Sequence, residues 1–256
     1  MSRNKIVGLI PSRLESSRLP KKALADICGL PMVVHVFHRC LMAKKLDEVF
    51  IATDSKEIAA AAEKYHCRVI MTRSDHETGT DRLAEAARKI DCDIVVNIQG
   101  DEALVKPEHI DVAIEALDKS PDVNMVLLIN LFFKEHSPSD IKVVLNEKDE
   151  IMYFSREDIP SGSRTPDRPM LKGYHVIPFR KEFLLQFASW GKGKLEKIEY
   201  IEFMRVLEKG HKIKAVLVEN DAVSVDTFED LKYVRSKMPS DPYFKQYRVD
   251  FKGLIP

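Results

Sequence analysis

The sequence lacks an excess of charge of either sign. Forty lysines and arginines balance 40 aspartates and glutamates, so the formal net charge is zero. Without an overall positive field, we expect no nucleic acid among its partners. No apolar run approaches the roughly 20 residues of a membrane-spanning helix, and the N-terminal run is too short for a signal peptide. We therefore expect a cytoplasmic protein without membrane insertion.

Cysteine and glycine are also sparse. The four cysteines, at positions 28, 40, 67 and 92, show no CxxC or Cys/His spacing, which argues against a disulfide framework or a zinc site. Among only 10 glycines there is no phosphate loop of the GxGxxG or GxxxxGK(S/T) type. A phosphate site in this chain would therefore have to rely on side chains.

Apolar runs do alternate with helical patterns. Strand-like runs at 5–10, 48–53, 67–72 and 93–99 are separated by helical periodicity at 32–44, 56–65 and 80–89, with a further helix at 107–117. This alternation predicts an α/β fold with a Rossmann-like parallel sheet.

The pattern changes after residue 123. Strand-like runs then follow one another closely, and helical periodicity returns only at 195–208 and from 227 onward, with a strand at 212–218 between them. Such a run favours an antiparallel or mixed extension of the sheet. We expect one domain over 1–256 with two halves, 1–122 and 123–256.

Basic residues follow the first strand, at the edge of a parallel sheet where ligands bind. The stretch PSRLESSRLPKK contains Arg13, Arg18 and Lys22. With the backbone amides of the loop, these side chains could neutralise several charges of a triphosphate. A solvated basic loop before a helix is the alternative interpretation.

Acidic residues follow two other β-branched runs. Asp101 and Glu102 come after IVVNIQG, and Asp226 comes after AVSV. Two carboxylates from distant positions suit Mg²⁺, which prefers oxygen ligands and takes others from water and phosphate. Asp226 also has the position of a helix N-cap, and the two roles are compatible.

Further polar groups suit a nucleoside. Gln99 and Arg73 carry groups that could bind a pyrimidine edge or ribose hydroxyls, and the run 78–80 could form a close turn against a base. A helix N-cap is the alternative for that run. We interpret His76 and His175 as ordinary surface or core histidines.

Taken together and in order, these segments resemble the 3-deoxy-manno-octulosonate cytidylyltransferase family, the CMP-Kdo synthetases. The matching stretches cover most of the chain: IPSRLESSRLPKKAL, GLPMVVHVFHRC, VFIATD, MTRSDHETGTDRLAEAA, VVNIQGDEALV, IKVVLN, YFSREDIP, LEKIEYIEFMRVLEKGHKI and VSVDTFEDL. The resemblance implies a nucleotide-diphospho-sugar transferase fold with a small dimerisation lobe, in a homodimer. It also implies transfer of CMP from CTP to a 2-keto-3-deoxy sugar acid with Mg²⁺, for surface polysaccharide or lipopolysaccharide synthesis.

The resemblance assigns roles to individual residues. It implies that the 1–122 half binds the nucleotide and that the 123–256 half binds the sugar acid and dimerises. Arg13, Lys22 and Asp101 are the implied catalytic residues. The further implied contacts are Arg18 for the triphosphate, Arg73, Thr80 and Gln99 for the cytidine, Asp101 and Asp226 for the metal, and Arg156 and Glu202 for the sugar acid.

Two positions depart from the family pattern. Gly173 stands where the family has a histidine that faces the sugar acid, and Phe203 replaces the glutamine of a Glu-Gln pair. An amino-substituted octulosonate or a nonulosonic acid therefore competes with Kdo as the expected acceptor.

Two other enzyme classes share the sheet architecture and the use of acids for a metal: the sugar-1-phosphate nucleotidyltransferases, which usually have a glycine-rich first loop, and the nucleotide-sugar glycosyltransferases, which have an Asp-x-Asp pair. Here the first loop lacks glycine and the acids are Asp101 and Glu102. A non-catalytic nucleotide-binding paralogue is a further alternative.

Overall fold

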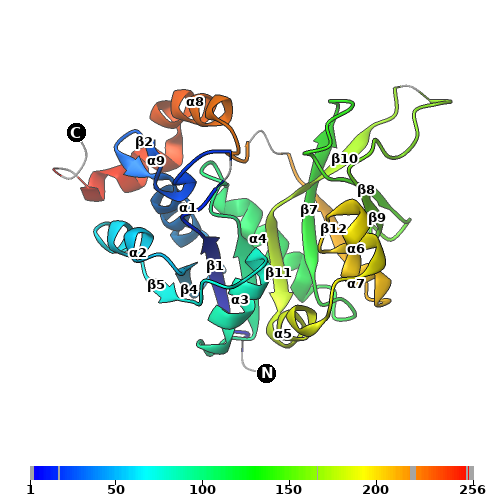
Figure 1. Cartoon of the computed structure of the whole chain (residues 1–256), viewed down its shortest axis with the longest axis horizontal. Helices are drawn as coiled ribbons and strands as arrows, with labels where there is room; N and C mark the ends of the chain where they lie inside the picture. Colours follow the sequence, from blue (N-terminus) through cyan, green and yellow to red (C-terminus); the bar gives the residue numbers. More distant parts are fainter. Residues whose placement is uncertain (1–2, 17, 166, 220–222, 252, 254–256) are drawn as a thin grey trace. The chain divides into compact units, whose positions relative to one another are not determined.

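The computed structural model in Figure 1 describes residues 3–16, 18–165, 167–219, 223–251 and 253. The chain forms two compact units: unit 1 comprises Met1–Asp111 and Asp221–Pro256, and unit 2 comprises Val112–Asn220. The C-terminal segment thus belongs to the same unit as the N-terminal segment, because chain contacts and not sequence order decide compactness. The division of roles between the halves 1–122 and 123–256 stays a prediction.

Parallel strands form the centre of unit 1. Strands β6, β1, β4 and β5 pair in this order, and every pair is parallel. Their bounds are Ile6–Ser12 for β1, Glu48–Thr53 for β4, Val69–Met71 for β5 and Ile94–Ile98 for β6. Nearly every residue of β1 and β6 is buried, as expected for strands covered on both faces.

Helices and short elements surround these strands in unit 1. The N-terminal part contains α1 (Met32–Leu41), α2 (Lys56–Glu63), α3 (Gly79–Arg88), the start of α4 (Pro107–Asp118), the 3-10 turn η1 (Lys22–Leu24) and the two-residue strands β2 (Asp26–Ile27) and β3 (Leu30–Pro31). The C-terminal part adds α8 (Phe228–Lys237), η2 (Met238–Ser240), α9 (Pro242–Tyr247) and η3 (Arg248–Phe251).

The C-terminal part is fastened to α1. Arg39 of α1 is fully buried, and its guanidinium lies 2.6 Å from the carboxylate of Asp241, which caps α9. The same guanidinium lies over the ring of Tyr243. Because a buried cation needs a partner, this pair anchors the C-terminal helices to unit 1.

Unit 2 contains a mixed sheet in the order β12, β7, β10, β8, β9. Strand β12 runs parallel to β7, and the other pairs are antiparallel. The strands are β7 (Val126–Phe132), β8 (Lys142–Leu145), β9 (Ile151–Ser155), β10 (Met170–Tyr174) and β12 (Lys214–Leu217). A further strand, β11 (Val176–Arg180), is joined to Met125 by one bridge at Phe179. The predicted mixed α/β fold is confirmed.

The helices of unit 2 differ from the sequence pattern. Helix α5 (Lys181–Ser189) was not expected, and the helix expected over 195–208 is two helices, α6 (Lys194–Glu199) and α7 (Met204–Glu208). Tyr200 ends α6 in the left-handed region with φ of 54°. Since no continuous helix accommodates that φ, the prediction of one helix was wrong.

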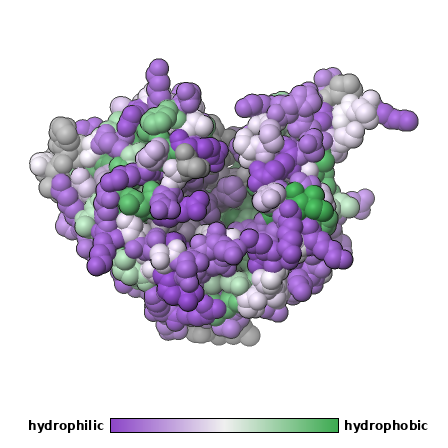
Figure 2. All heavy atoms as spheres, in the orientation of Figure 1, coloured by the Kyte–Doolittle hydropathy of each residue, from purple (hydrophilic) through white to green (hydrophobic). Residues whose placement is uncertain are grey.

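The surface of unit 2 exposes several large apolar side chains. Among them, Phe133 is 75% exposed, Met152 61% and Leu217 58%. The face of the molecule in Figure 2 is largely polar, with a few small groups of apolar residues. None of the helices in the described ranges has the length and apolar character needed to cross a membrane. All four cysteines are free thiols, and three of them are buried.

Gly100 permits a close approach between β1 and the loop after β6. A Cβ atom at this position would lie 2.8 Å from Ser12 Oγ and 3.0 Å from the Pro11 carbonyl oxygen. We expect Gly100→Ala to lower the free energy of unfolding by roughly 1–3 kcal/mol, because the strand end must move away. Gly191→Ala is the control, since nothing lies within 4 Å of its added Cβ. Equal urea midpoints for the two variants would contradict the expectation.

Thr227 caps α8. Its hydroxyl accepts a hydrogen bond from Asp230 N at 3.2 Å, and the Asp230 carboxylate accepts one from Thr227 N at 2.8 Å. Thr227→Ala should lower the free energy of unfolding by about 1 kcal/mol, because one amide loses its acceptor. Thr165→Ala, at an exposed loop position, is the control. Thermal unfolding checks this, and a wild-type midpoint for Thr227→Ala would show that the cap adds no stability.

Candidate active site

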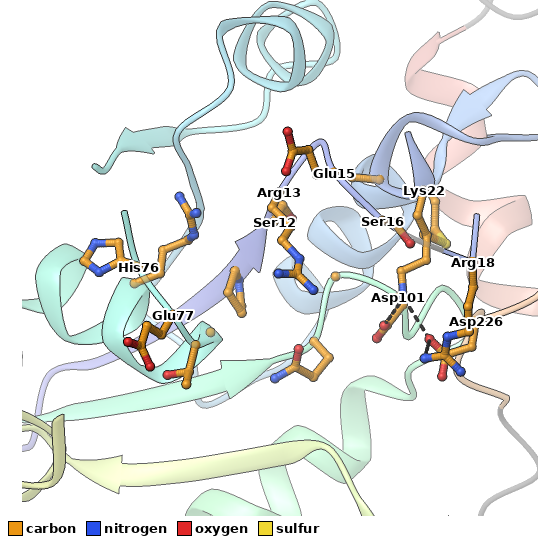
Figure 3. A pocket seen from close by; sticks show the side chains of 18 residues that line it. Ser12, Arg13, Glu15, Ser16, Arg18, Lys22, His76, Glu77, Asp101 and Asp226 are labelled. Carbon is orange, nitrogen blue, oxygen red and sulfur yellow. Dashed lines mark hydrogen bonds and ion pairs between the residues drawn. The ribbon is translucent and has the colours of Figure 1, made fainter. Parts of the chain in front are cut away.

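A cavity of about 270 Å³ opens in unit 1, near the carboxyl ends of β1 and β6. This volume is close to the lower end of small-molecule pockets, roughly 300–1,000 Å³. Figure 3 shows that its labelled side chains come from the basic loop after β1, from the loop before α3 and from the segments at 101 and 226. The sequence-predicted residues that line it are Arg13, Arg18, Lys22, Gln99, Asp101 and Asp226.

The ammonium group of Lys22 lies between two carboxylates in this cavity. Its Nζ donates to Asp101 Oδ2 at 2.6 Å and to Asp226 Oδ1 at 3.1 Å (Figure 3). Arg18 also pairs with Asp226 Oδ1, at 3.0 Å. Burial lowers the pKa of Lys22, but the carboxylates of Asp101 and Asp226 outweigh this effect, and the pKa is raised. The ammonium therefore stays charged at neutral pH.

Backbone and side-chain contacts bring Asp226 to Asp101. Val225 N donates to the carbonyl oxygen of Asp101 at 3.0 Å, and the Ser224 hydroxyl donates to the Glu102 carboxylate. The Asp226 side chain does not cap α8, because that cap is Thr227. The Asp226 carboxylate is thereby available to the cavity, where it binds the two cations.

The basic loop faces the cavity and is not only a solvated segment. Both Arg13 and Arg18 line it, and the Arg18 side chain is 58% exposed. Within the part of the chain that the structure describes, Arg13 takes part in no ion pair. Its guanidinium therefore remains able to bind an anion that enters the cavity.

The loop before α3 forms another wall of the cavity. The lining residues there are His76, Glu77, Thr78 and Gly79. Thr78 caps α3, and a capping box joins it to Asp81. The same turn thus caps the helix and, through Thr78 and Gly79, lines the cavity, and its contact with a base stays a prediction.

Two predicted cytidine residues do not line the cavity. The Arg73 side chain is 70% exposed and pairs with Asp75 and Glu85, and Thr80 is only 2% exposed. Of the predicted cytidine residues, only Gln99 lines it, and its amide donates to Asn97 Oδ1 at 3.3 Å. The roles of Arg73 and Thr80 in binding stay predictions.

Sequence reasoning missed Arg82. Its side chain is 6% exposed, lines the cavity, and binds Asp54 at 3.0 Å and the Thr72 hydroxyl at 2.6 Å. Arg82 lies four residues after the cap Thr78, about one helical turn further. The four-residue spacing could have identified Arg82 from the sequence, because a side chain one turn after the N-cap residue of a helix lies on the same side of that helix.

The predicted sugar-acid residues belong to unit 2. Arg156 donates to the carbonyl oxygens of Glu199, Tyr200 and Pro138 at 2.8, 3.0 and 2.8 Å. It thus binds the turn that ends α6, two residues before the half-buried Glu202. A guanidinium has five N–H groups, so these three contacts leave donors for a carboxylate.

The two departures from the family pattern are packed in unit 2. A Cβ atom on Gly173 would lie 3.4 Å from the Leu127 side chain. Phe203 is 7% exposed, and its ring centroid lies 6.2 Å from those of both Phe154 and Phe187. Both positions therefore have a packing role, and their effect on acceptor choice stays a prediction.

The sequence is similar to those of known cytidylyltransferases. The cytidylyltransferase family model matches residues 7–213. The 3-deoxy-manno-octulosonate cytidylyltransferase of Geotalea uraniireducens (strain Rf4) is 42% identical over 91% of this chain and 99% of its own. The 8-amino-3,8-dideoxy-manno-octulosonate cytidylyltransferase of Shewanella baltica (strain OS195) is 38% identical over 91% of this chain and 98% of its own.

Solved structures agree with the sequence relatives. The CMP:2-keto-3-deoxy-manno-octonic acid synthetase complexed with CTP superposes with a TM-score of 0.89 and is 34% identical, over 92% of this chain and 99% of that one. A cytidylyltransferase from Leptospira borgpetersenii, 17% identical with a TM-score of 0.65 over 99% of this chain and 97% of that one, shares the fold. This chain is a nucleotidyltransferase that belongs to the 3-deoxy-manno-octulosonate cytidylyltransferase family.

Proposed function

We propose that this enzyme transfers CMP from CTP to Kdo, for surface polysaccharide or lipopolysaccharide synthesis. The anomeric hydroxyl of the acid loses its proton to solvent, and its oxygen forms a bond to the α-phosphorus. The bond from the α-phosphorus to the oxygen that bridges to the β-phosphorus breaks, and pyrophosphate leaves with that oxygen. The observation that carries the proposal is Lys22 between Asp101 and Asp226 in a cavity lined by further arginines. The names of the relatives support the choice of nucleotide and acid.

In this proposal the basic loop neutralises the triphosphate. Arg13 and Arg18 are the exposed cations at the cavity, and Lys22 is a less exposed one. Charge-assisted hydrogen bonds from these groups bind phosphate oxygens and stabilise the negative charge that moves onto the leaving pyrophosphate. Lys22 can exchange a carboxylate for a phosphate oxygen, because both are anionic acceptors.

We propose Mg²⁺ as the cofactor, held by Asp101 and Asp226. The donor set fits, because one cation, the Lys22 ammonium, already lies within reach of both carboxylates. Within the described ranges, no group of three or more histidine, cysteine, aspartate and glutamate side chains could hold a metal ion. Water and phosphate would thus supply the remaining ligands, as is usual for Mg²⁺. When bound, the ion would polarise the phosphoryl oxygens and stabilise developing charge.

We propose that Arg156 binds the carboxylate of the acid and that Glu202 contributes hydroxyl contacts. A guanidinium suits the planar carboxylate, and this one is oriented by three carbonyl oxygens. Relatives named for Kdo and for its 8-amino analogue are similarly close to this chain. The amino-substituted acid is therefore the acceptor to compare with Kdo, and a nonulosonic acid is the next.

Pyrophosphate release with a panel of nucleotides and acids tests the proposal. We expect turnover with CTP to exceed turnover with ATP, GTP and UTP. A nucleotide that leaves polar groups of the pocket unpaired loses about 1–3 kcal/mol of binding free energy per group. The acceptors are Kdo, its 8-amino-8-deoxy analogue and a nonulosonic acid. A preference for Kdo of a hundredfold or more in kcat/KM, roughly 2.7 kcal/mol, would exclude an altered acceptor pocket. Equal turnover of ATP and CTP would contradict the proposal.

Asp101→Asn and Asp226→Asn should each remove most turnover and leave the fold intact. Each change removes a carboxylate that would hold the metal beside the reacting phosphate, and the cost is roughly 10²-fold or more in kcat. Asp91→Asn, an exposed position, is the control. Near-normal kcat at saturating Mg²⁺ in either site variant would contradict the assignment, as would a far-ultraviolet spectrum unlike that of the wild type.

We also propose a homodimer formed through unit 2. The exposed Phe133, Met152 and Leu217 support this, as does β9, which ends the sheet of unit 2 as an edge strand. An unpaired edge with apolar neighbours needs to be covered, and a second copy can cover it. Light scattering at micromolar concentration should give the mass of two chains. A monomer mass there, or a dimer that persists unchanged in Met152→Lys, would count against this interface.

A further inference from the structure

Glu85 of α3 binds the cavity-lining loop from behind. Its Oε2 atom accepts hydrogen bonds from the backbone N–H of Arg73 at 3.0 Å and from Nε2 of His76 at 2.6 Å. Its Oε1 atom accepts a hydrogen bond from Lys89 at 2.7 Å, and Lys89 also donates to the carbonyl oxygen of Met71. One carboxylate thus joins two points of the loop between β5 and α3 to the helix that follows.

The Glu85 carboxylate is charged, and its hydrogen bond with His76 is largely buried. Burial raises the pKa of Glu85, but hydrogen bonds from Lys89, Arg73 and His76 outweigh burial and lower the pKa to about 2. An ionised carboxylate only accepts hydrogen bonds, so Nε2 of His76 carries a proton. The His76 side chain is 7% exposed and the Glu85 side chain 16%, which shields this hydrogen bond from water.

The loop held by Glu85 forms a wall of the cavity. Residues 76–79 line it, and Figure 3 shows His76 and Glu77 across from Ser12 and Arg13. The end of the loop is fastened separately, because Thr78 and Asp81 form the capping box of α3. Glu85 is not among the lining residues, so it acts on the cavity only through the loop.

We propose that Glu85 is a positioning residue for the nucleotide. It holds His76 and the backbone of Arg73 so that the 76–79 wall has its binding shape before CTP arrives. If the loop already has this shape, it loses less conformational entropy when CTP binds, and this raises the affinity for CTP. The inference rests on the proposed function, because it assigns the wall to the CTP side of the reaction.

Glu85→Gln tests the inference, since it keeps the size of the side chain and removes its charge. We expect KM for CTP and its calorimetric Kd to rise about tenfold while kcat stays within about twofold. Glu48→Gln is the matched control. Glu48 is also partly buried, pairs with Lys5 and Arg68, and has a lowered pKa, but it begins β4 at the amino end of the strand.

His76→Phe provides a second variant that removes the donor and keeps the ring. If Glu85 acts through His76, the double variant should bind CTP little worse than either single variant. Additive losses would overturn the inference, as would an unchanged KM in Glu85→Gln or a loss confined to kcat. A wild-type enzyme that neither binds nor turns over CTP would overturn the proposed function itself, which separates the two failures.

The pH dependence of stability supplies an independent readout. The pKa of Glu85 is about 2 in the folded protein, below the ordinary value of 4.5, so its contribution is present above pH 4.5 and lost as pH falls toward 2. The thermal midpoints of wild type and Glu85→Gln should therefore differ at pH 7 and converge as the pH falls toward 2. A constant difference would show that the carboxylate does not hold the loop.

Discussion

The contact of Lys22 with Asp101 and Asp226 holds the site together. These carboxylates lie 79 and 204 residues further along the chain than the lysine. Two neighbouring carboxylates repel each other and lose hydration when partly buried, and a single ammonium between them offsets both costs. Lys22 therefore stabilises the meeting of the loop after β6 with the segment before α8, which a backbone hydrogen bond to the Asp101 carbonyl oxygen also joins. The position of the Asp226 carboxylate at the cavity depends on this arrangement, whereas the pair of Arg39 and Asp241 anchors the C-terminal helices to unit 1.

Three further residues position the segments around this contact. Gly100 lets the chain after β6 pass against β1, and Thr227 caps α8 so that the neighbouring Asp226 carboxylate remains available to the cavity. Glu85 holds the wall before α3. Each of them acts at the end of a strand or on a segment that leads into a helix, where the paired backbone fixes the geometry. A triphosphate would thus meet cavity walls that need little reordering, and this reduces the cost of binding.

Strong local patterns allowed most of the fold to be predicted. The strand 48–53 was expected with its observed bounds, and β1, β5, β6 and the helices α1 to α4 lie within a few residues of their predicted ranges. The short strands β2 and β3 and the helix α9 were not predicted. The expected helix over 195–208 failed at Tyr200, because periodicity does not report a single residue of positive φ. In the site, Arg82 and not Arg73 lines the cavity. Arg82 follows the cap Thr78 by about one helical turn, whereas Arg73 lies in the loop before that helix and its side chain is exposed.

The sequence by itself was enough to predict the chemistry that we propose for this protein. A basic loop after a buried strand, acids after two further strand-like runs and the order of these motifs are local features, readable without coordinates. Only the tertiary structure decided which groups meet. It brought Asp226 beside Asp101, gave the α8 cap to Thr227 and packed Phe203 among aromatic rings. The physical reason is that strand and helix patterns arise from neighbouring residues, whereas ion pairs and packing join residues whose sequence separation carries no signal of their contact.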